Sequence, residues 1–140
     1  MIVLDTDLSA ALMQPDLDST VWTWLGLQTD TELHTTSITV AEMLHGALLL
    51  PDGARREHML AALAGCFGEG FGGRVLPFDA AAAVEYADII AWRRHIEWPI
   101  RSRDAQIAAI ARAHGATLAT RYVADYEECG IRVINPWELM

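Results

Sequence analysis

Four acidic residues, far apart in the sequence, stand beside segments with strand or helix patterns: Asp5, Glu42, Asp104 and Asp125. Asp5 directly follows the apolar run 2–4, which is typical of a strand buried on both faces. The carboxyl ends of parallel strands lie at the same edge of a sheet, and α/β proteins bind their ligands at that edge. Carboxylates gathered there would repel one another, and a bound cation would relieve that repulsion. Oxygen ligands favour Mg²⁺ or Mn²⁺, and such a site could hydrolyse a phosphodiester bond.

Each of these carboxylates also has a purely structural interpretation. Asp5 or Asp7 could do no more than cap a following helix. We expect Glu42 and Asp104 in the first turn of a helix, where the helix dipole favours an acid in any case. Asp125 could lie on the surface of a short helix. The joint placement of these acids at one predicted edge nevertheless favours a functional site.

The segments that must position the acids alternate between strands and helices. Strands are predicted over residues 2–4, 32–36, 74–76, 117–120 and 131–134. Helices are predicted over residues 8–13, 17–27, 40–50, 54–67, 80–95, 103–114 and 122–128. This order predicts one α/β domain over residues 1–140, with a central parallel sheet and helices on both faces.

Local signals predict how several helices begin and which side of each faces the core. Ser37 or Thr39 is the expected N-cap of the helix over 40–50, and Ser102 that of the helix over 103–114. The expected inward residues are Val21, Trp22, Trp24 and Leu25 in 17–27; Val40, Met43, Leu44, Ala47 and Leu48 in 40–50; and Val84, Ala87, Ile90 and Ala91 in 80–95.

The stretch 68–73 matches the pattern G-x-G-x-x-G, which in dinucleotide-binding proteins follows a strand and opens a helix. Here it follows a predicted helix and precedes a predicted strand. We therefore interpret it as a flexible loop. The chain also lacks a G-x-S-x-G motif, and its five histidines show no ligand spacing, so acyl transfer finds no support.

The composition indicates a folded protein that works in a reducing compartment. The chain has 140 residues, 52% of them apolar, which is enough for a normal core. No apolar run approaches the roughly 20 residues that cross a bilayer, and the N-terminus has no basic signal region. Cys66 and Cys129 form neither a disulfide framework nor a metal spacing. We expect a cytoplasmic protein without a membrane segment.

The charge pattern is unusual for a protein that binds nucleic acid. The net charge is −9, and all ten cationic side chains are arginines, because the chain has no lysine. A broad basic surface is therefore excluded. Binding to RNA would require arginines gathered in one cleft, or a metal or basic partner; several do occur close together, at 55–56, at 93–94 and at 101 and 103. The alternative is a solvated acidic surface.

Several stretches together resemble one known family. They are LDTD at 4–7, ITVAEMLHG at 38–46, RVLPFD at 74–79, PIRSRDAQIAAIARAHG at 99–115, LATR at 118–121 and VINPWELM at 133–140. In order and spacing they are similar to the PIN-domain ribonucleases, and above all to the VapC and FitB toxins of bacterial type II toxin–antitoxin modules. The resemblance covers nearly the whole chain.

This resemblance implies an α/β/α sandwich with about five parallel strands and an endoribonuclease that depends on Mg²⁺ or Mn²⁺. Asp5, Glu42 and Asp104 match the family's three catalytic acids, of which Asp5 and Asp104 would coordinate the metal. Thr6 and Thr120 match small polar positions beside them. The implied partners are an RNA substrate, a small cognate antitoxin with a segment in the active-site groove, and a second copy of the chain in a homodimer.

The chain departs from the family pattern at two positions. Asp7 replaces a usual Asn, and Tyr122 stands where the family often has a fourth polar residue, a role that Asp125 could take over. The departure at Tyr122 leaves open a second hypothesis, a PIN fold that binds RNA or protein without cutting. Asp5-Thr6-Asp7 also fits the first motif of haloacid-dehalogenase phosphatases, but those enzymes and receiver domains use a later lysine that this chain lacks.

Overall fold

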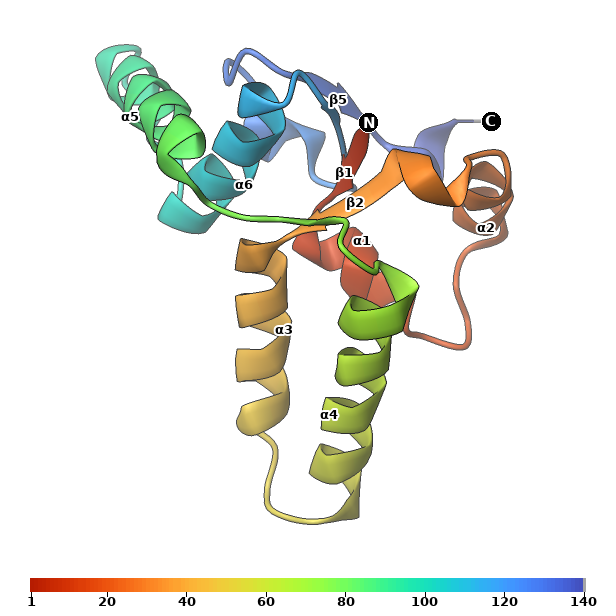
Figure 1. Cartoon of the computed structure of the whole chain (residues 1–140). Helices are drawn as coiled ribbons and strands as arrows, with labels where there is room; N and C mark the ends of the chain where they lie inside the picture. The colour runs from red at the N-terminus through yellow and green to blue at the C-terminus, as the bar shows by residue number, and fades with distance from the viewer. Residues whose placement is uncertain (140) are drawn as a thin grey trace.

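The protein, described here over residues 1–139 by a computed structural model, is built on a five-stranded parallel sheet. The strand order is β3-β2-β1-β4-β5, so the first strand lies at the centre (Figure 1). The strands are β1 (Ile2–Leu4), β2 (Leu33–Thr36), β3 (Val75–Leu76), β4 (Thr117–Ala119) and β5 (Arg132–Ile134). This confirms the predicted parallel sheet. Met140, the end of the predicted domain, lies outside the described residues.

Strand β1 is buried on both faces, as its unbroken apolar sequence predicts. Val3 pairs in register with His34 of β2 and Leu118 of β4. Its side chain packs into the apolar cluster on one face of the sheet, whereas Leu4 packs into the cluster on the other. Both side chains are fully buried. The strand therefore fixes the position of Asp5, the residue that follows it.

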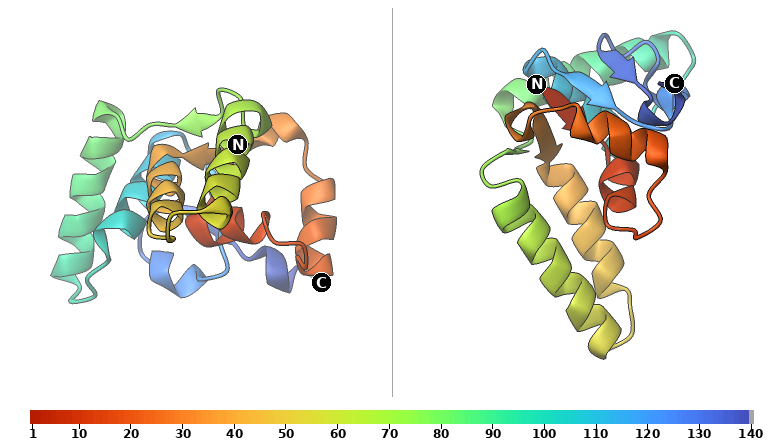
Figure 2. Two further views of the ribbon diagram at one scale, coloured as in Figure 1. Left: turned by 90° about the horizontal axis from the view of Figure 1, so that it is seen from below. Right: turned by 90° about the vertical axis from the view of Figure 1, so that its right-hand side faces the viewer.

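Helices cover both faces of the sheet, which confirms the predicted α/β/α sandwich. One face packs against α5 (Ala80–His95) and α6 (Ser102–Ala113), and the other against α1 (Thr6–Ala11) and α2 (Ser19–Gly26). The remaining helices, α3 (Ser37–Leu48) and α4 (Ala54–Gly65), form a hairpin that projects from the sheet (Figures 1 and 2). Short helical turns span Asp30–Glu32, Cys66–Gly70, Val123–Tyr126 and Pro136–Glu138.

Helix α6 is the most deeply buried helix of the described chain. Its buried side chains are Ala105, Ile107, Ala108, Ala109, Ile110 and Ala111. The alanines let the helix approach both the sheet and α5 closely, while the two isoleucines fill the remaining space. Burial on so many sides fixes the helix axis, and with it the place of Asp104 in the first turn.

Four helices begin at residues other than those predicted. Helix α2 starts at Ser19 rather than residue 17, because the Asp18 side chain caps it at the Thr20 N–H. Helix α1 starts at Thr6 rather than residue 8, because Asp5 itself is the N-cap and accepts a hydrogen bond from the Leu8 main chain. Helix α3 starts at Ser37, because the Thr36 hydroxyl caps it at the Thr39 N–H. Helix α6 starts at Ser102, with Arg101 at the N-cap position.

The predicted inward face of α5 is wrong in three of its four residues. Val84 is 70% exposed, and Ala87 and Ala91 are exposed as well. The buried side chains are instead Ala82, Ile89 and Arg93. A helix with so many alanines carries more than one apolar stripe, and packing against α6 selects the stripe that holds the larger Ile89. Trp22 and Leu48, also predicted to face inward, are exposed.

The stretch 68–73 is more regular than the predicted loop. Residues Cys66–Gly70 form a π-helical turn that extends α4, and Gly72 and Gly73 then take positive φ angles that lead into β3. The stretch follows a helix and precedes a strand, so it lacks the setting of a dinucleotide site. Within residues 1–139, no helix combines the length and the apolarity needed to cross a bilayer.

Arg93 is a buried arginine that ties α5 to the turn after β4. Its side chain is held among main-chain carbonyls: Nη1 donates to Glu127 at 2.9 Å and to Asp125 at 3.3 Å, and Nε donates to Trp98. The guanidinium also stacks on the Trp98 ring, with 4.6 Å between the guanidinium carbon and the ring centroid. Arg93 thereby holds the turn that carries Asp125 and Tyr126.

Replacing Arg93 by methionine is expected to lower the free energy of unfolding by about 3 kcal/mol, because buried carbonyls lose their donor. Urea denaturation followed by circular dichroism measures the change. The matched control is Arg94→Met, at an exposed position on the same helix, where a change within about 0.5 kcal/mol is expected. Equal effects at both positions would contradict the structural role assigned to Arg93.

Candidate active site

A pocket at the carboxyl end of β1 collects the predicted acids. Its volume is 170 Å³. The residues that line it are Asp5, Thr6, Asp7, Glu42, Arg101, Arg103, Asp104, Ile107 and Tyr126. The structure therefore brings Asp5, Glu42 and Asp104 together from three separate elements. They lie at the edge of the sheet where the carboxyl ends of its strands meet, as the sequence predicts.

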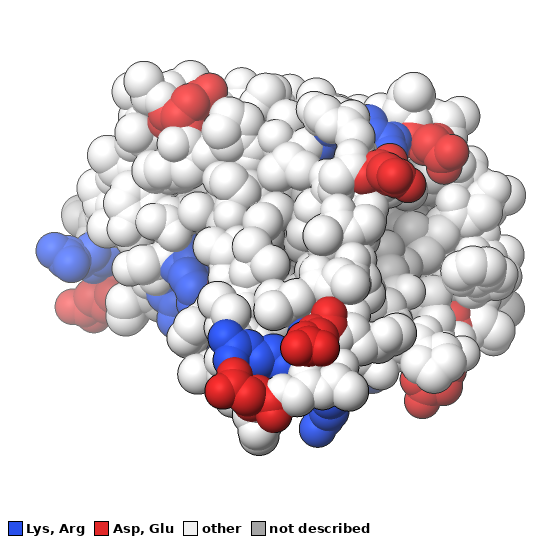
Figure 3. All heavy atoms as spheres, turned by 60° about the horizontal axis from the view of Figure 1, so that its bottom comes forward, with Lys and Arg blue, Asp and Glu red and all other residues white. Residues whose placement is uncertain are grey.

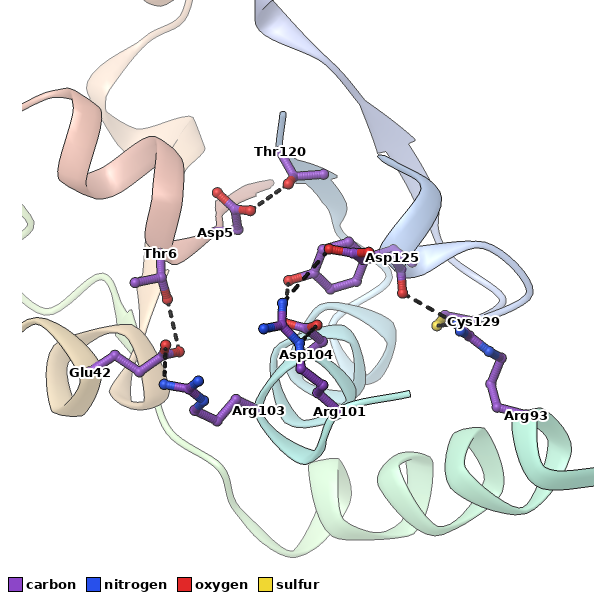
Figure 4. Close-up of polar contacts among 11 residues, drawn as sticks. Asp5, Thr6, Glu42, Arg93, Arg101, Arg103, Asp104, Thr120, Asp125 and Cys129 are labelled. Atoms are coloured by element: carbon purple, nitrogen blue, oxygen red, sulfur yellow. Dashed lines mark hydrogen bonds and ion pairs between the residues drawn. The ribbon is translucent and has the colours of Figure 1, made fainter. Parts of the chain in front are cut away.

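Asp5 is the buried end of this pocket, with 2% of its surface exposed. One carboxylate oxygen accepts the Leu8 N–H at 2.8 Å, and the other accepts the Thr120 hydroxyl (Figure 4). Burial raises the pKa of Asp5 from 3.8 to about 6, although these two hydrogen bonds oppose the shift. Asp5 therefore both caps α1 and lines the pocket, so its structural role as a cap leaves it available to the pocket.

Glu42 reaches the pocket from the second turn of α3, so its predicted place in the first turn is wrong. The reason is that the helix begins earlier than predicted, at Ser37. The Thr6 hydroxyl donates to Oε1 of Glu42 at 3.0 Å, and Nη1 of Arg103 donates to Oε2 at 2.9 Å. Thr6 also lies 3.0 Å from the Thr39 hydroxyl, which links α1 to α3 beneath the pocket.

Asp104 lies in the first turn of α6, as predicted. Its Oδ2 accepts a hydrogen bond from Nε of Arg101 at 3.1 Å, and its Oδ1 lies 3.4 Å from the Tyr126 hydroxyl (Figure 4). Burial, and then the negative charge of Asp104, raise the pKa of Tyr126, so its hydroxyl stays neutral and can donate. Asp104 thus has one arginine and one tyrosine as its nearest polar neighbours.

Tyr122, which departs from the family pattern, and Asp125, which could replace it, are not part of the pocket lining. Oδ2 of Asp125 lies 3.8 Å from Nη2 of Arg101, so both Asp125 and Asp104 pair with this arginine. Tyr122 is half exposed, and its main-chain N–H donates to the Thr120 hydroxyl at 3.0 Å. Among the described residues, Tyr122 is not part of the pocket lining, so its side chain does not block the acids.

Sequence reasoning missed three contributors to the site. Tyr126 lines the pocket, but a tyrosine in a short polar helix gives no signal of this. Arg93 holds the main chain of Asp125 from beneath, and the Arg93-Arg94 pair does not reveal which member is buried. Asp7 also lines the pocket; loss of solvent and then the nearby Asp104 charge raise its pKa. Its place two residues after Asp5 was the available signal.

On the face of the described residues that Figure 3 draws, the charged side chains form no broad basic area. On the face drawn in Figure 3, arginines lie in small groups beside acidic side chains. Arg56 pairs with Asp52, and Arg112 pairs with Glu85 and Asp88.

The two cysteines are not activated. Burial raises the pKa of the Cys66 and Cys129 thiols, so neither thiol is prepared to act as a nucleophile.

The chemistry of the pocket fits a hard divalent cation, because its ligating atoms are carboxylate and hydroxyl oxygens. The carboxyl of Asp5, whose pKa burial raises, would gain most from a nearby positive charge. Within residues 1–139, however, no three acidic, histidine or cysteine side chains lie close enough together to hold a metal ion as they stand. The pocket therefore offers suitable donors, but they must move closer to share one ion.

The fold and the acids at its sheet edge define a PIN domain, and the comparison with family models agrees: the PIN domain model matches residues 2–121. The chain belongs to the PIN-domain family. It is 40% identical over 138 residues to VapC ribonuclease Y4jK of Sinorhizobium fredii, covering 99% of both chains. It is 33% identical over 137 residues to Toxin FitB of Neisseria gonorrhoeae, covering 98% of this chain and 99% of the relative.

A solved structure gives the same result in three dimensions. A chain of FitAB bound to a DNA fragment superimposes with a TM-score of 0.92 and 33% identity, covering 100% of this chain and 98% of the other. The resemblance inferred from the sequence motifs to VapC and FitB proteins is thereby confirmed.

Asp5→Asn is expected to stabilise the fold at neutral pH. The carboxyl has a pKa of about 6 in the folded protein and an ordinary value of 3.8, so the ionised form costs stability. This cost is absent below pH 3.8, grows between pH 3.8 and 6, and reaches about 3 kcal/mol above pH 6. Asparagine removes the charge and retains the helix cap.

Urea denaturation of both proteins at pH 8 and at pH 4 measures this effect. The variant should be more stable at pH 8, and the difference should be small at pH 4. A variant that is less stable than the wild type at pH 8 would show that the Asp5 carboxylate is a net stabilising group.

Proposed function

We propose that this protein is the toxin of a toxin–antitoxin pair and hydrolyses RNA in the cytoplasm with the help of Mg²⁺ or Mn²⁺. The observation that carries the proposal is the convergence of Asp5, Glu42 and Asp104 on one pocket. The 40% identity to a VapC ribonuclease along the whole chain supports the same activity. RNA as substrate follows from that relative's name and from the phosphodiester chemistry that the acids favour.

In this proposal, each residue of the pocket has a role in binding the metal ion or in orienting a carboxylate. Asp5 and Asp104 would hold the metal, and Glu42 completes the acidic pocket beside them. Thr120 and Thr6 orient the carboxylates of Asp5 and Glu42 through their hydroxyl hydrogen bonds. A divalent ion bound there supplies an activated water and neutralises charge on the phosphate.

Purified protein is expected to cleave total RNA in Mg²⁺ or Mn²⁺ and to lose this activity in EDTA. Asp5→Asn and Asp104→Asn should each lower the rate by about 100-fold or more, because each removes a metal ligand. Gel electrophoresis of the RNA measures cleavage, and growth arrest in cells without antitoxin measures toxicity. Asp30→Asn, at an exposed acid in the turn before β2, is the matched control.

Two outcomes would contradict this proposal in different ways. Full toxicity of both site variants would show that the assigned acids are wrong. A folded wild-type protein, free of antitoxin, that cleaves no RNA with either metal and arrests no cells would favour the alternative of a binding module.

The proposed antitoxin has a suitable surface on the projecting hairpin. An apolar groove of 230 Å³ runs between α1, α3 and α4, and its lining residue Met43 follows Glu42 of the acidic pocket in the chain. Its lining residues are Ala10, Met43, Gly46, Ala47, Leu50, Arg55, Met59 and Leu63. The related FitB is seen in a FitAB complex, which supports a protein partner here. An apolar helix in the groove, followed by a basic segment in the pocket, would match both surfaces.

We also propose a homodimer formed through the outer stripe of α5. Val84, Ala87 and Ala91 lie at helical spacing and are exposed, although their apolar character is typical of a packed face. The small alanines would allow two copies of the helix to approach closely, and the exposed Trp92 on the same helix adds apolar area.

Ala87→Glu is expected to convert the dimer to a monomer, because it places a charge at the centre of this stripe. Sedimentation velocity at micromolar concentration measures the state of the protein. Trp22→Glu, at an exposed apolar residue on α2, should leave the dimer intact. A wild-type protein that is monomeric, or an Ala87→Glu variant that stays dimeric, would rule out this interface.

A further inference from the structure

Arg101 and Arg103 are the arginines that line the acidic pocket. Each pairs with a different carboxylate: Arg101 with Asp104 at 3.1 Å, and Arg103 with Glu42 at 2.9 Å. Figure 4 shows the two side chains extending in different directions, Arg103 toward Glu42 and Arg101 toward Asp104 and Asp125. They come from the start of α6, where the N-cap residue and the second helical residue carry them.

These pairs occupy the oxygens that a metal ion would need. Glu42 uses Oε2 for Arg103 and Oε1 for Thr6. Asp104 uses Oδ2 for Arg101, and its Oδ1 faces the Tyr126 hydroxyl. With both oxygens engaged, each carboxylate is directed toward its own partner. This explains why the acids share one pocket while no three of the described candidates can hold an ion together.

The two arginines are also free to move. Their side chains are 70% and 58% exposed, in contrast to Arg93, which is 2% exposed and fixed among carbonyls. The carboxylates are only 16% and 19% exposed, but the arginine side of each pair lies in solvent, which weakens the pair, so a divalent ion that binds several carboxylates at once can displace a guanidinium. A displaced Arg103 would then be without a carboxylate, and a displaced Arg101 would keep only the longer contact to Asp125, at 3.8 Å, so each guanidinium could bind a phosphate through two hydrogen bonds.

We propose that Arg101 and Arg103 compete with the metal ion for Asp104 and Glu42 and, once displaced, bind the phosphates of the RNA beside the cleaved bond. This proposal rests on the function proposed above. It explains how a chain with a net charge of −9 could attract RNA to an acidic pocket. Metal binding would neutralise the acids and expose two cations in the same step, so RNA would bind well only after the metal.

The double variant Arg101→Gln/Arg103→Gln tests the competition without any cleavage. Isothermal titration calorimetry with Mn²⁺ alone should give a dissociation constant about three- to tenfold lower than that of the wild type, because the ion no longer displaces two guanidinium groups. The control Arg94→Gln/Arg132→Gln removes the same charge at two exposed positions, one on α5 and one on β5, and should bind Mn²⁺ as the wild type does.

RNA binding tests the second half of the proposal. The probe is a fluorescent single-stranded RNA of mixed sequence in saturating Mn²⁺, checked on a gel to be intact after each titration. The variant should bind it more weakly, and the slope of log affinity against log salt should fall by about 1.4, or 0.7 for each lost phosphate contact. The control variant should keep the wild-type slope.

The outcomes separate this proposal from the proposed function. Tighter Mn²⁺ binding together with a smaller salt slope supports the proposal. Unchanged Mn²⁺ affinity, or an unchanged salt slope, in a variant whose wild-type parent binds Mn²⁺ and cleaves RNA would overturn the proposal and leave the nuclease function intact. Wild-type protein that binds no Mn²⁺ and cleaves no RNA would overturn both.

Discussion

Repulsion between carboxylates at the end of a parallel sheet is the constraint on which the rest of this structure depends. Asp5, Glu42 and Asp104 converge because three elements end or begin at the same sheet edge. The protein reduces this repulsion in one way at Asp5 and in another at Glu42 and Asp104. The carboxyl of Asp5 is buried and held by Leu8 and Thr120, and burial raises its pKa. The other two acids pair with exposed arginines. A divalent cation bound between the three acids would reduce the repulsion among all of them at once.

The elements that position the acids are buried, whereas the arginines that pair with the acids are exposed. Helix α6 is buried along most of its length, so Asp104 starts from a fixed point. Arg93 fixes the turn behind Asp125 and Tyr126 by binding its carbonyls. Arg101 and Arg103, in contrast, extend from the exposed start of α6 and reach their acids through long, flexible side chains. The buried arginine therefore fixes the main chain, whereas the two exposed arginines form ion pairs that a metal ion could replace.

Two apolar surfaces of the described residues lie outside the core. One is the groove of the α3–α4 hairpin, and the other is the outer stripe of α5. The hairpin stands away from the sheet, so its groove can receive a partner without disturbing the core (Figure 2). The groove and the acidic pocket share helix α3, which contributes Met43 to the groove and Glu42 to the pocket.

The sequence by itself determined the sheet, the order of its elements and the three central acids. These follow from local signals: the apolar run 2–4 predicts a buried strand, and strands that alternate with helices predict parallel pairing. Tertiary structure decided which stripe of α5 is buried, because Val84 and Ile89 are both apolar and only packing against α6 distinguishes them. It also decided which arginines pair with the acids and which one is buried. Side chains far apart in the chain meet only after folding, so no local pattern records the contact between Arg103 and Glu42.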